Sequence, residues 1–341
     1  MIAEAALLGI SFVGSLAGVE LFRRWSLHRN LLDIPNERSS HSTPTPRGGG
    51  IVIVAISLAG YAILSAVFDT PFSWGYFIGA LIVAAVSWLD DLYSLPFWSR
   101  LITHICAAAI VVWDLGAWDI VSVPFTATNL SLGQVLGLLI TVGWIVWMVN
   151  AYNFMDGIDG IAALQAVVAA IAWAILSYGS GLKGSFLFAG VLASASAGFL
   201  IHNWQPARIF MGDVGSAFLG FTLAAMPLIS ADEANDSMPF LPLVAVVFVW
   251  FFVFDTVITL LKRIVARERI WEAHRQHIYQ LMVADGLSHS AVSLMYGSFA
   301  AILAISAAIS LYFGGMSNVL VVSSLMVLTS VILYLGLWKK R

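Results

Sequence analysis

Apolar segments of about 20 residues follow one another along almost the whole chain, separated by short polar connections. A helix needs about 20 apolar residues to cross the hydrocarbon core of a bilayer. Only 10% of the residues are charged, whereas soluble domains carry about 25%. Because unpaired backbone groups cannot face lipid, we interpret the apolar segments as helices. The sequence therefore predicts an all-α polytopic membrane protein.

The lengths of the apolar segments predict about 11 transmembrane helices, which form one integral-membrane domain over residues 1–341. The Arg23-Arg24 pair follows the first segment instead of preceding it, so we expect an uncleaved first span. The predicted spans cover residues 3–22, 49–68, 73–89, 100–116, 131–149, 160–178, 185–201, 215–230, 240–261, 291–312 and 317–337.

The basic residues of the connections predict the orientation. Of the 16 Lys and Arg residues, all except Lys183 fall in one set of loops. An excess of Lys and Arg marks cytoplasmic loops, so the N-terminus is expected outside, in the periplasm, and the C-terminus in the cytoplasm. The cytoplasmic loops expected to form the active site cover residues 23–48, 90–99, 150–159, 202–214 and 262–290.

Six aspartates lie at the edges of apolar segments or inside them, where a carboxylate is costly unless it faces a polar cavity. Five of them fall in the predicted cytoplasmic loops, and we consider them functional candidates: Asp90, Asp91, Asp156, Asp159 and Asp213. Asp255 lies about two turns inside the ninth predicted span. For Asp255, a structural hydrogen bond and a supporting catalytic role are equally open.

The segment NAYNFMDGIDG carries Asn150, Asn153, Asp156 and Asp159 at intervals of three residues. At the end of a helix this spacing places the polar groups along one side. Two amides and two carboxylates can hold a hydrated Mg²⁺ ion and bond phosphate or sugar hydroxyls. So compact an array favours a functional site over a polar loop cap.

The other two acidic motifs leave alternatives open. The adjacent carboxylates of Asp90 and Asp91 repel, which raises the proton affinity of one unless a cation is near. They are either metal ligands or proton acceptors, or a solvated pair that ends a span. Asp213, between glycines in FMGDVGS, suits a magnesium ligand, although an N-cap role for Asp213 or Ser216 is also open.

The last cytoplasmic loop contains His274, Arg275 and His277. Because Mg²⁺ prefers oxygen ligands, imidazoles here suit contacts with phosphate and hydroxyl groups. A zinc site is the alternative, but it needs further nitrogen or sulfur ligands, and only His289 is near in sequence. Lys262 and Arg263 are interpreted as markers of the membrane interface.

The first cytoplasmic loop contains two cations and a run of glycines before the second span. Arg38 and Arg47 can bind anionic oxygens with two hydrogen bonds each, and the glycines expose backbone N–H groups. A flexible, solvated loop is the alternative interpretation.

Taken together and in this order, the motifs resemble the polyprenyl-phosphate N-acetylhexosamine-1-phosphate transferase family, glycosyltransferase family 4. That family includes the enzymes that start O-antigen and enterobacterial common antigen, and the phospho-MurNAc-pentapeptide translocase. The resemblance covers nearly the whole chain, from DIPNERSSHSTPTPRGGG to HRQHIYQ. Its most specific parts are the acid pair, NAYNFMDGIDG, FMGDVGS and the histidine loop.

The resemblance implies a phosphotransferase (EC 2.7.8.-) that moves a sugar 1-phosphate from a UDP-sugar to undecaprenyl phosphate and releases UMP. The implied cofactor is Mg²⁺, with Mn²⁺ as an alternative ion. The implied partners are undecaprenyl phosphate, a UDP-N-acetylhexosamine or deoxy derivative, and the lipid bilayer, with no nucleic acid; a homodimer is left open. The implied location is the bacterial inner membrane, with the active site facing the cytoplasm.

The resemblance also implies residue roles. The catalytic candidates are Asp90, Asp91, Asp156 and Asp159, of which the first two would serve the lipid phosphate. The metal ligands are Asp213 and Asp156. The substrate-binding residues are Asn150, Asn153, Arg38, Arg47, His274, Arg275 and His277.

Two departures indicate the branch of the family. The peptidoglycan branch has a lysine soon after its acid pair, whereas here Leu92-Tyr93-Ser94-Leu95 follows and Arg100 is the first cation. That branch also has adjacent histidines, whereas this chain has HRQH. Both favour the O-antigen or capsule branch, with N-acetylglucosamine or a deoxy sugar such as N-acetylfucosamine or N-acetylquinovosamine. The alternatives are the MurNAc-pentapeptide transferase and a cation-coupled transporter, which would place ionisable groups near the midplane.

Overall fold

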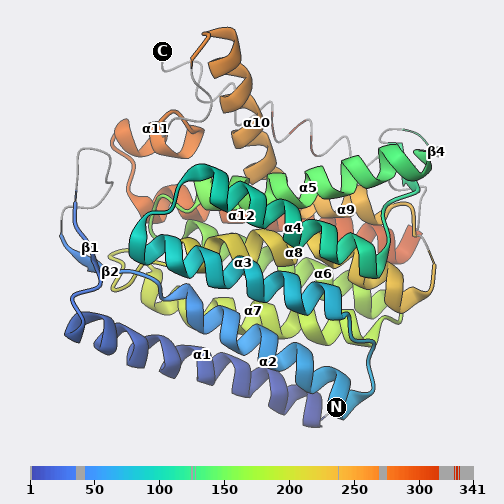
Figure 1. Cartoon of the computed structure of the whole chain (residues 1–341), viewed down its shortest axis with the longest axis horizontal. Coiled ribbons are helices and arrows are strands. Elements are labelled where there is room, and N and C mark those ends of the chain that lie inside the picture. Colours follow the sequence, from blue (N-terminus) through green and yellow to red (C-terminus); the bar gives the residue numbers. More distant parts are fainter. Residues whose placement is uncertain are drawn as a thin grey trace.

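The computed structural model of the chain describes residues 2–35, 43–123, 126, 128–236, 238–268 and 275–314, and the single residues 326, 328 and 330. Helices dominate these ranges, which confirms the all-α polytopic prediction (Figure 1). Within them the only strands form two short antiparallel ladders. One pairs β1 (Leu32–Asp33) with β2 (Thr45–Pro46), and the other pairs β3 (Ile120–Ser122) with β4 (Asn129–Ser131).

Nine helices in the described ranges are long and apolar enough to cross a membrane. They are α1 (Ile2–His28), α2 (Gly50–Phe68), α3 (Trp74–Tyr93), α4 (Phe97–Leu115), α5 (Gly133–Met155), α6 (Ile161–Gly179), α7 (Lys183–Asn203), α8 (Asp213–Ala234) and α12 (His289–Gly314). Each matches one predicted span. Most of the eleventh predicted span, 317–337, lies outside the described residues.

The ninth predicted span is not one continuous helix. It divides at Val249 into α9 (Leu241–Phe248) and α10 (Trp250–Val265), whose axes differ by 79°. In Figure 1, α9 lies along the bundle, whereas α10 turns out of it. The two helices together cover the predicted span 240–261, which is bent and not one straight helix. On the buried face of α10, Asp255 accepts hydrogen bonds from the short helix α11 (Ile278–Ala284) and from α12.

Helix α8 forms the centre of the bundle, and 94% of its most apolar 18-residue window is buried. Its first turns touch the start of α2 through glycine. A Cβ atom on Gly215 would lie 2.7 Å from the Cα atom of Gly50, closer than side chains allow. This contact fixes the N-terminal end of α8 against α2.

Exposed aromatic side chains mark both ends of the bundle. Trp25, Tyr93 and Trp98 lie at the end where α3 finishes and α4 begins. Trp74, Trp113 and Tyr178 lie at the opposite end. Such belts are typical of membrane–water interfaces. All five aspartates predicted to lie in cytoplasmic loops are at the first of these ends, called here the acid end.

Candidate active site

Asp90 lies at the acid end, on the last turns of α3. The acid pair closes this helix, as predicted, although α3 continues to Tyr93 and so extends beyond the predicted span 73–89. Its buried carboxylate accepts hydrogen bonds from the backbone N–H of Leu95 at 2.6 Å and from Nη1 of Arg100 at 2.7 Å. Asp90 therefore closes the turn between α3 and α4 and pairs with the first cation after it.

Asp91 is directed to a different element, the beginning of α8. One carboxylate oxygen accepts the backbone N–H of Asp213 at 3.0 Å, and the other accepts that of Val214 at 3.1 Å. The first N–H groups of a helix lack intrahelical partners and attract negative charge. Gly212 permits the approach, since its φ is 76° and a Cβ there would lie 2.7 Å from Oδ2 of Asp91. The charge of Arg47, half-buried before α2, also acts on Asp91.

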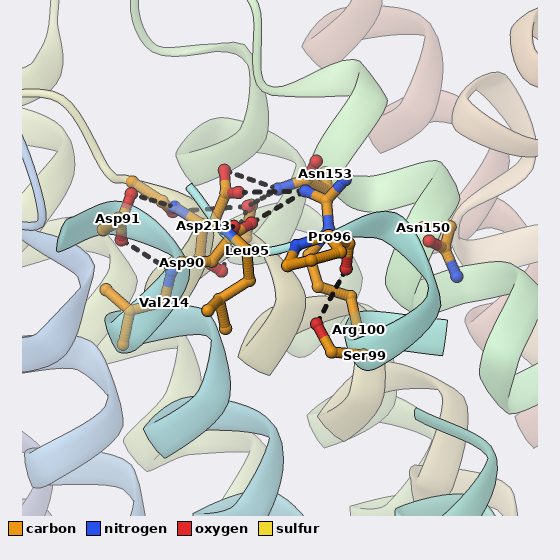
Figure 2. A network of polar contacts seen from close by, with 12 residues as sticks. Asp90, Asp91, Leu95, Pro96, Ser99, Arg100, Asn150, Asn153, Asp213 and Val214 are labelled. Atoms are coloured by element: carbon orange, nitrogen blue, oxygen red, sulfur yellow. Dashed lines mark hydrogen bonds and ion pairs between the residues drawn. The ribbon is translucent and has the colours of Figure 1, made fainter. Parts of the chain in front are cut away.

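Asp213 is the first residue of α8 and the most accessible member of this cluster, with 37% of its side chain exposed. Its Oδ1 accepts a hydrogen bond from Nδ2 of Asn153 at 2.9 Å, and Nη1 of Arg100 lies 3.6 Å from its Oδ2. The same Asn153 amide donates to Ser216 Oγ at 3.0 Å. Figure 2 shows these groups from α3, α4, α5 and α8 converging at one place.

Asp156 immediately follows α5 and is half-buried. None of the described residues donates a hydrogen bond to its carboxylate. Burial and the charges of Asp213, Asp91 and Asp159 raise the pKa of Asp156 well above its ordinary value. A carboxylate in this setting favours a bound cation.

Asp159 faces away from this cluster. Its Oδ2 accepts the backbone N–H of Ala207 at 3.0 Å, and Nδ1 of His289 lies 3.3 Å from its Oδ1. The expectation that Asp156 and Asp159 lie on one side of a helix end is wrong, because α5 ends at Met155 and the chain turns. In the structure Asp159 joins the 156–160 loop to the loop before α8 and to α12.

Asn150 is also separate from Asn153, as Figure 2 shows. Its amide donates to Val146 O at 2.7 Å and lies 3.3 Å from Nδ1 of the buried His104. It lines a cavity of about 80 Å³ between α5 and α10, together with Phe154, Thr256, Thr259, Arg263 and His277. The predicted array of two amides and two acids is therefore divided between two adjacent places.

His277 is buried and occupies the N-cap position of α11, where its backbone N–H donates to Oε1 of Gln280 at 3.3 Å. Its Nδ1 lies 3.1 Å from Oδ1 of Asp255, and its ring is nearly parallel to those of Phe154 and Tyr279, at centroid distances of 6.2 and 5.9 Å. Arg275 is exposed. His274 and Arg38 lie outside the described residues, so the predicted helical face of His274 and His277 is not tested.

Two residues in this network had no role in the sequence-based interpretation: Arg100 and His104. Arg100 carries a weak signal, because it is the first cation after the acid pair. His104 carries none, since its partner Asn150 comes from another helix. For Asp255, whose role was left open, the structure shows hydrogen bonds from α11 and α12. Ser216 was noted only as a candidate N-cap, whereas its hydroxyl accepts from Asn153.

The donor set fits a magnesium ion. In the part of the chain that the structure describes, no three His, Cys, Asp or Glu side chains converge as a complete metal cage. Mg²⁺ commonly takes only one or two protein carboxylates and leaves its other positions to water and phosphate. Asp213 and Asp156 provide such oxygens. The two described histidines of the zinc alternative have other partners: His277 contacts Asp255, and His289 contacts Asp159.

Comparison with known proteins gives a consistent result. The sequence model of glycosyl transferase family 4 matches residues 73–231. A probable undecaprenyl-phosphate N-acetylglucosaminyl 1-phosphate transferase of Bacillus subtilis is 28% identical over 87% of this chain and 83% of its own. A decaprenyl-phosphate N-acetylglucosaminephosphotransferase of Mycobacterium tuberculosis is 30% identical over 80% of this chain and 74% of its own. A phospho-N-acetylmuramoyl-pentapeptide-transferase of Gloeothece citriformis is 31% identical over 55% of this chain and 54% of its own.

Proposed function

The chain belongs to glycosyl transferase family 4, and from this premise we propose that it transfers an N-acetylhexosamine 1-phosphate from a UDP-sugar to undecaprenyl phosphate and releases UMP. The observation that carries the proposal is the convergence of Asp90, Asp91, Asn153, Asp156 and Asp213 at one end of a membrane bundle. A lipid phosphate and a soluble sugar nucleotide can meet only at such an end.

We propose Mg²⁺ as the cofactor, with Mn²⁺ as an alternative ion. Asp213 and Asp156 would hold it, because their carboxylates are the least committed to protein donors. When bound, the ion neutralises charge on the diphosphate and on the departing UMP. Asn153 fixes the orientation of the Asp213 carboxylate by its 2.9 Å hydrogen bond.

In the proposed reaction, an oxygen of the lipid phosphate forms a bond to the sugar-bearing phosphorus, and the bond from that phosphorus to the UMP oxygen breaks. The second pKa of a phosphate monoester lies near 6, so the lipid phosphate is largely dianionic at neutral pH. Positioning and charge neutralisation then dominate phosphoryl transfer. Arg100 and Arg47 supply positive charge beside the acid pair.

Direct attack by the lipid phosphate is preferred to a covalent phosphoryl-aspartate. The carboxylate oxygens of Asp90 and Asp91 accept hydrogen bonds from Arg100 and from backbone N–H groups. These contacts support a role in organising the site, because a nucleophilic oxygen must be free to reach phosphorus. A trapped sugar-phosphate or UMP adduct on Asp90, Asp91, Asp156 or Asp159 would overturn direct attack.

We further propose that the reaction is the first membrane step of O-antigen or related cell-surface polysaccharide synthesis, at the cytoplasmic face of the bacterial inner membrane. The loop charges support the cytoplasmic face, and the departures from the peptidoglycan motifs support this branch. N-acetylglucosamine is the first sugar to test, because the Bacillus and Mycobacterium relatives are named for it. Clustering of the acids at one end supports an enzyme over a transporter.

The test is release of UMP by the purified chain in lipid vesicles, given Mg²⁺, undecaprenyl phosphate and a panel of UDP-sugars. The panel contains UDP-N-acetylglucosamine, UDP-N-acetylfucosamine, UDP-N-acetylquinovosamine and UDP-MurNAc-pentapeptide. Turnover with one of the first three supports the proposal. Turnover only with UDP-MurNAc-pentapeptide would support the peptidoglycan alternative, and solute uptake without turnover would support the transporter.

A further inference from the structure

Asp255 is a fully buried carboxylate on α10. One oxygen accepts hydrogen bonds from the backbone N–H of Ile278 at 2.9 Å and from Thr259 Oγ1 at 3.2 Å. The other accepts from the backbone N–H of Tyr279 at 3.2 Å and from Tyr296 Oη at 2.8 Å. A buried charge persists only when it is paired or hydrogen-bonded in this way. Asp255 therefore joins α10, α11 and α12 at a single point.

The same carboxylate also determines the state of His277. Nδ1 of the His277 ring lies 3.1 Å from Oδ1 of Asp255. An ionised carboxylate only accepts hydrogen bonds, so Nδ1 must carry the hydrogen. The tautomer of a histidine is set by the partner of one ring nitrogen, so Asp255 selects the Nδ1–H form of His277.

Aromatic contacts fix the plane of the His277 ring. Phe154 on α5 and Tyr279 on α11 stack on it with interplanar angles of 29° and 20°. The Tyr279 hydroxyl donates to the backbone carbonyl of Phe154 at 2.9 Å, which ties α11 to the end of α5. Gly157 allows this arrangement, because a Cβ atom there would collide with the Tyr279 hydroxyl.

The held imidazole lines the cavity between α5 and α10. Asn150 and Arg263 line the same cavity beside His277. Asn150 is one helical turn from Asn153, which contacts Asp213. The cavity and the acidic cluster thus share the last turns of α5.

We propose that Asp255 is a positioning residue for the transfer reaction. It holds His277 as the Nδ1–H tautomer and seats the N-terminus of α11, so that the imidazole meets a phosphate or hydroxyl of the substrate from a fixed direction. This inference rests on the proposed function, because it assigns Asp255 to the same reaction. In this proposal, the bend between α9 and α10 serves to bring Asp255 to the N-terminus of α11.

The test compares Asp255→Asn with Asp114→Asn. Asp114 also caps a helix: it accepts from Ser73 Oγ at 2.6 Å and from the Gly75 N–H at 2.8 Å, at the end of the bundle opposite the acid end. Each variant is checked for folding by thermal unfolding, then assayed for UMP release. The ring nitrogens are observed by solid-state NMR of ¹⁵N-histidine-labelled protein in vesicles, and a His277→Gln variant identifies the His277 signal among the seven histidines.

We expect the wild-type spectrum to show His277 with hydrogen on Nδ1. Asp255→Asn should change that signal and lower kcat/KM by about 10- to 100-fold, the size of the loss seen when the partner that orients a metal-bound histidine is removed. Asp114→Asn should change neither. An Nε2–H tautomer in the wild-type protein would overturn the proposal, as would full turnover by Asp255→Asn.

The spectroscopic result separates this proposal from the proposed function. Absence of turnover by the wild-type protein with every UDP-sugar would contradict the function, whereas the tautomer still shows whether Asp255 orients His277. If Asp255→Asn does not fold, the proposal is judged by the tautomer of His277 in the wild-type protein: Nδ1–H supports it and Nε2–H overturns it.

Discussion

The carboxylate of Asp91 accepts the backbone N–H of Asp213 at 3.0 Å, although 122 residues separate the two in sequence. The end of α3 thereby fixes the beginning of α8, and the side chain of Asp213 is directed toward Asn153 and Arg100. The acid pair and the magnesium candidate are therefore parts of one structure.

Replacing Asp91 by asparagine should weaken the start of α8. The amide can accept one of the two backbone N–H groups but brings no charge to the helix terminus. We expect a loss of about 1–2 kcal/mol in unfolding free energy, together with reduced transfer activity. Thermal unfolding in detergent and UMP release measure both effects.

Ser73→Ala provides the control for Asp91→Asn. The Ser73 hydroxyl caps α3 by accepting the N–H of Tyr76 at 2.9 Å, at the end opposite the acids. This variant should be destabilised to a similar degree while its transfer rate per folded molecule is retained. Equal losses of activity in both variants would mean that Asp91 has no more than a general effect on stability.

Replacing Arg100 by glutamine should have opposite effects on turnover and on magnesium affinity. Arg100 lies 2.7 Å from Asp90 and 3.6 Å from Asp213, so its charge opposes a cation at Asp213. Because the side chain is partly exposed, such a pair is worth about 1 kcal/mol or less. We expect the Mg²⁺ concentration for half-maximal activity to fall by about 2- to 5-fold, while maximal turnover drops. A higher magnesium requirement would contradict this geometry.

Gly215→Ala should separate α8 from α2. The new methyl group would meet the Cα atom of Gly50 and the side chain of Met211. Overpacking of this kind costs about 1–3 kcal/mol, so the melting temperature and the activity should both fall. Gly143→Ala in α5 is the matched control, because no atom lies within 4 Å of its added Cβ. An unaffected Gly215→Ala protein would show that the two helices approach less closely.

Hydropathy was sufficient to predict nine of the membrane helices, since length and apolar character are local properties. It did not predict the break at Val249. Neither glycine nor proline stands at that position, and the bend instead accompanies hydrogen bonds from α11 and α12 to Asp255. Those partners are distant in sequence, so no local sequence pattern indicates the break at Val249.

The site was predicted in composition more accurately than in arrangement. The motifs identified Asp90, Asp91, Asn153, Asp156 and Asp213, and the structure brings these together. Spacing alone placed Asn150 and Asp159 in the same array, because it assumed a regular helix end. The end of α5 at Met155 and the contact of Asn150 with His104 direct these two residues elsewhere.

The proposed orientation predicts which loops an impermeant reagent reaches. In a Cys106→Ala background, Ser180→Cys lies after α6, at the end opposite the acids, and Ser288→Cys lies before α12 at the acid end. Both positions are exposed. An impermeant maleimide added to intact cells should label Ser180→Cys, while Ser288→Cys should react only after the membrane is opened. The reverse pattern would invert the proposed topology.

The most direct measurement is the magnesium dependence of UMP release by wild-type protein and Asp213→Asn, with undecaprenyl phosphate and the preferred UDP-sugar. The asparagine oxygen can still accept the hydrogen bond of Asn153, so the fold should persist while an anionic metal ligand is lost. We predict that wild-type turnover requires Mg²⁺ and stops when a chelator is added. The rate of the variant should be lower by a factor of about 100 or more. Wild-type turnover without a divalent ion, or equal rates and equal magnesium requirements for both proteins, would contradict the account.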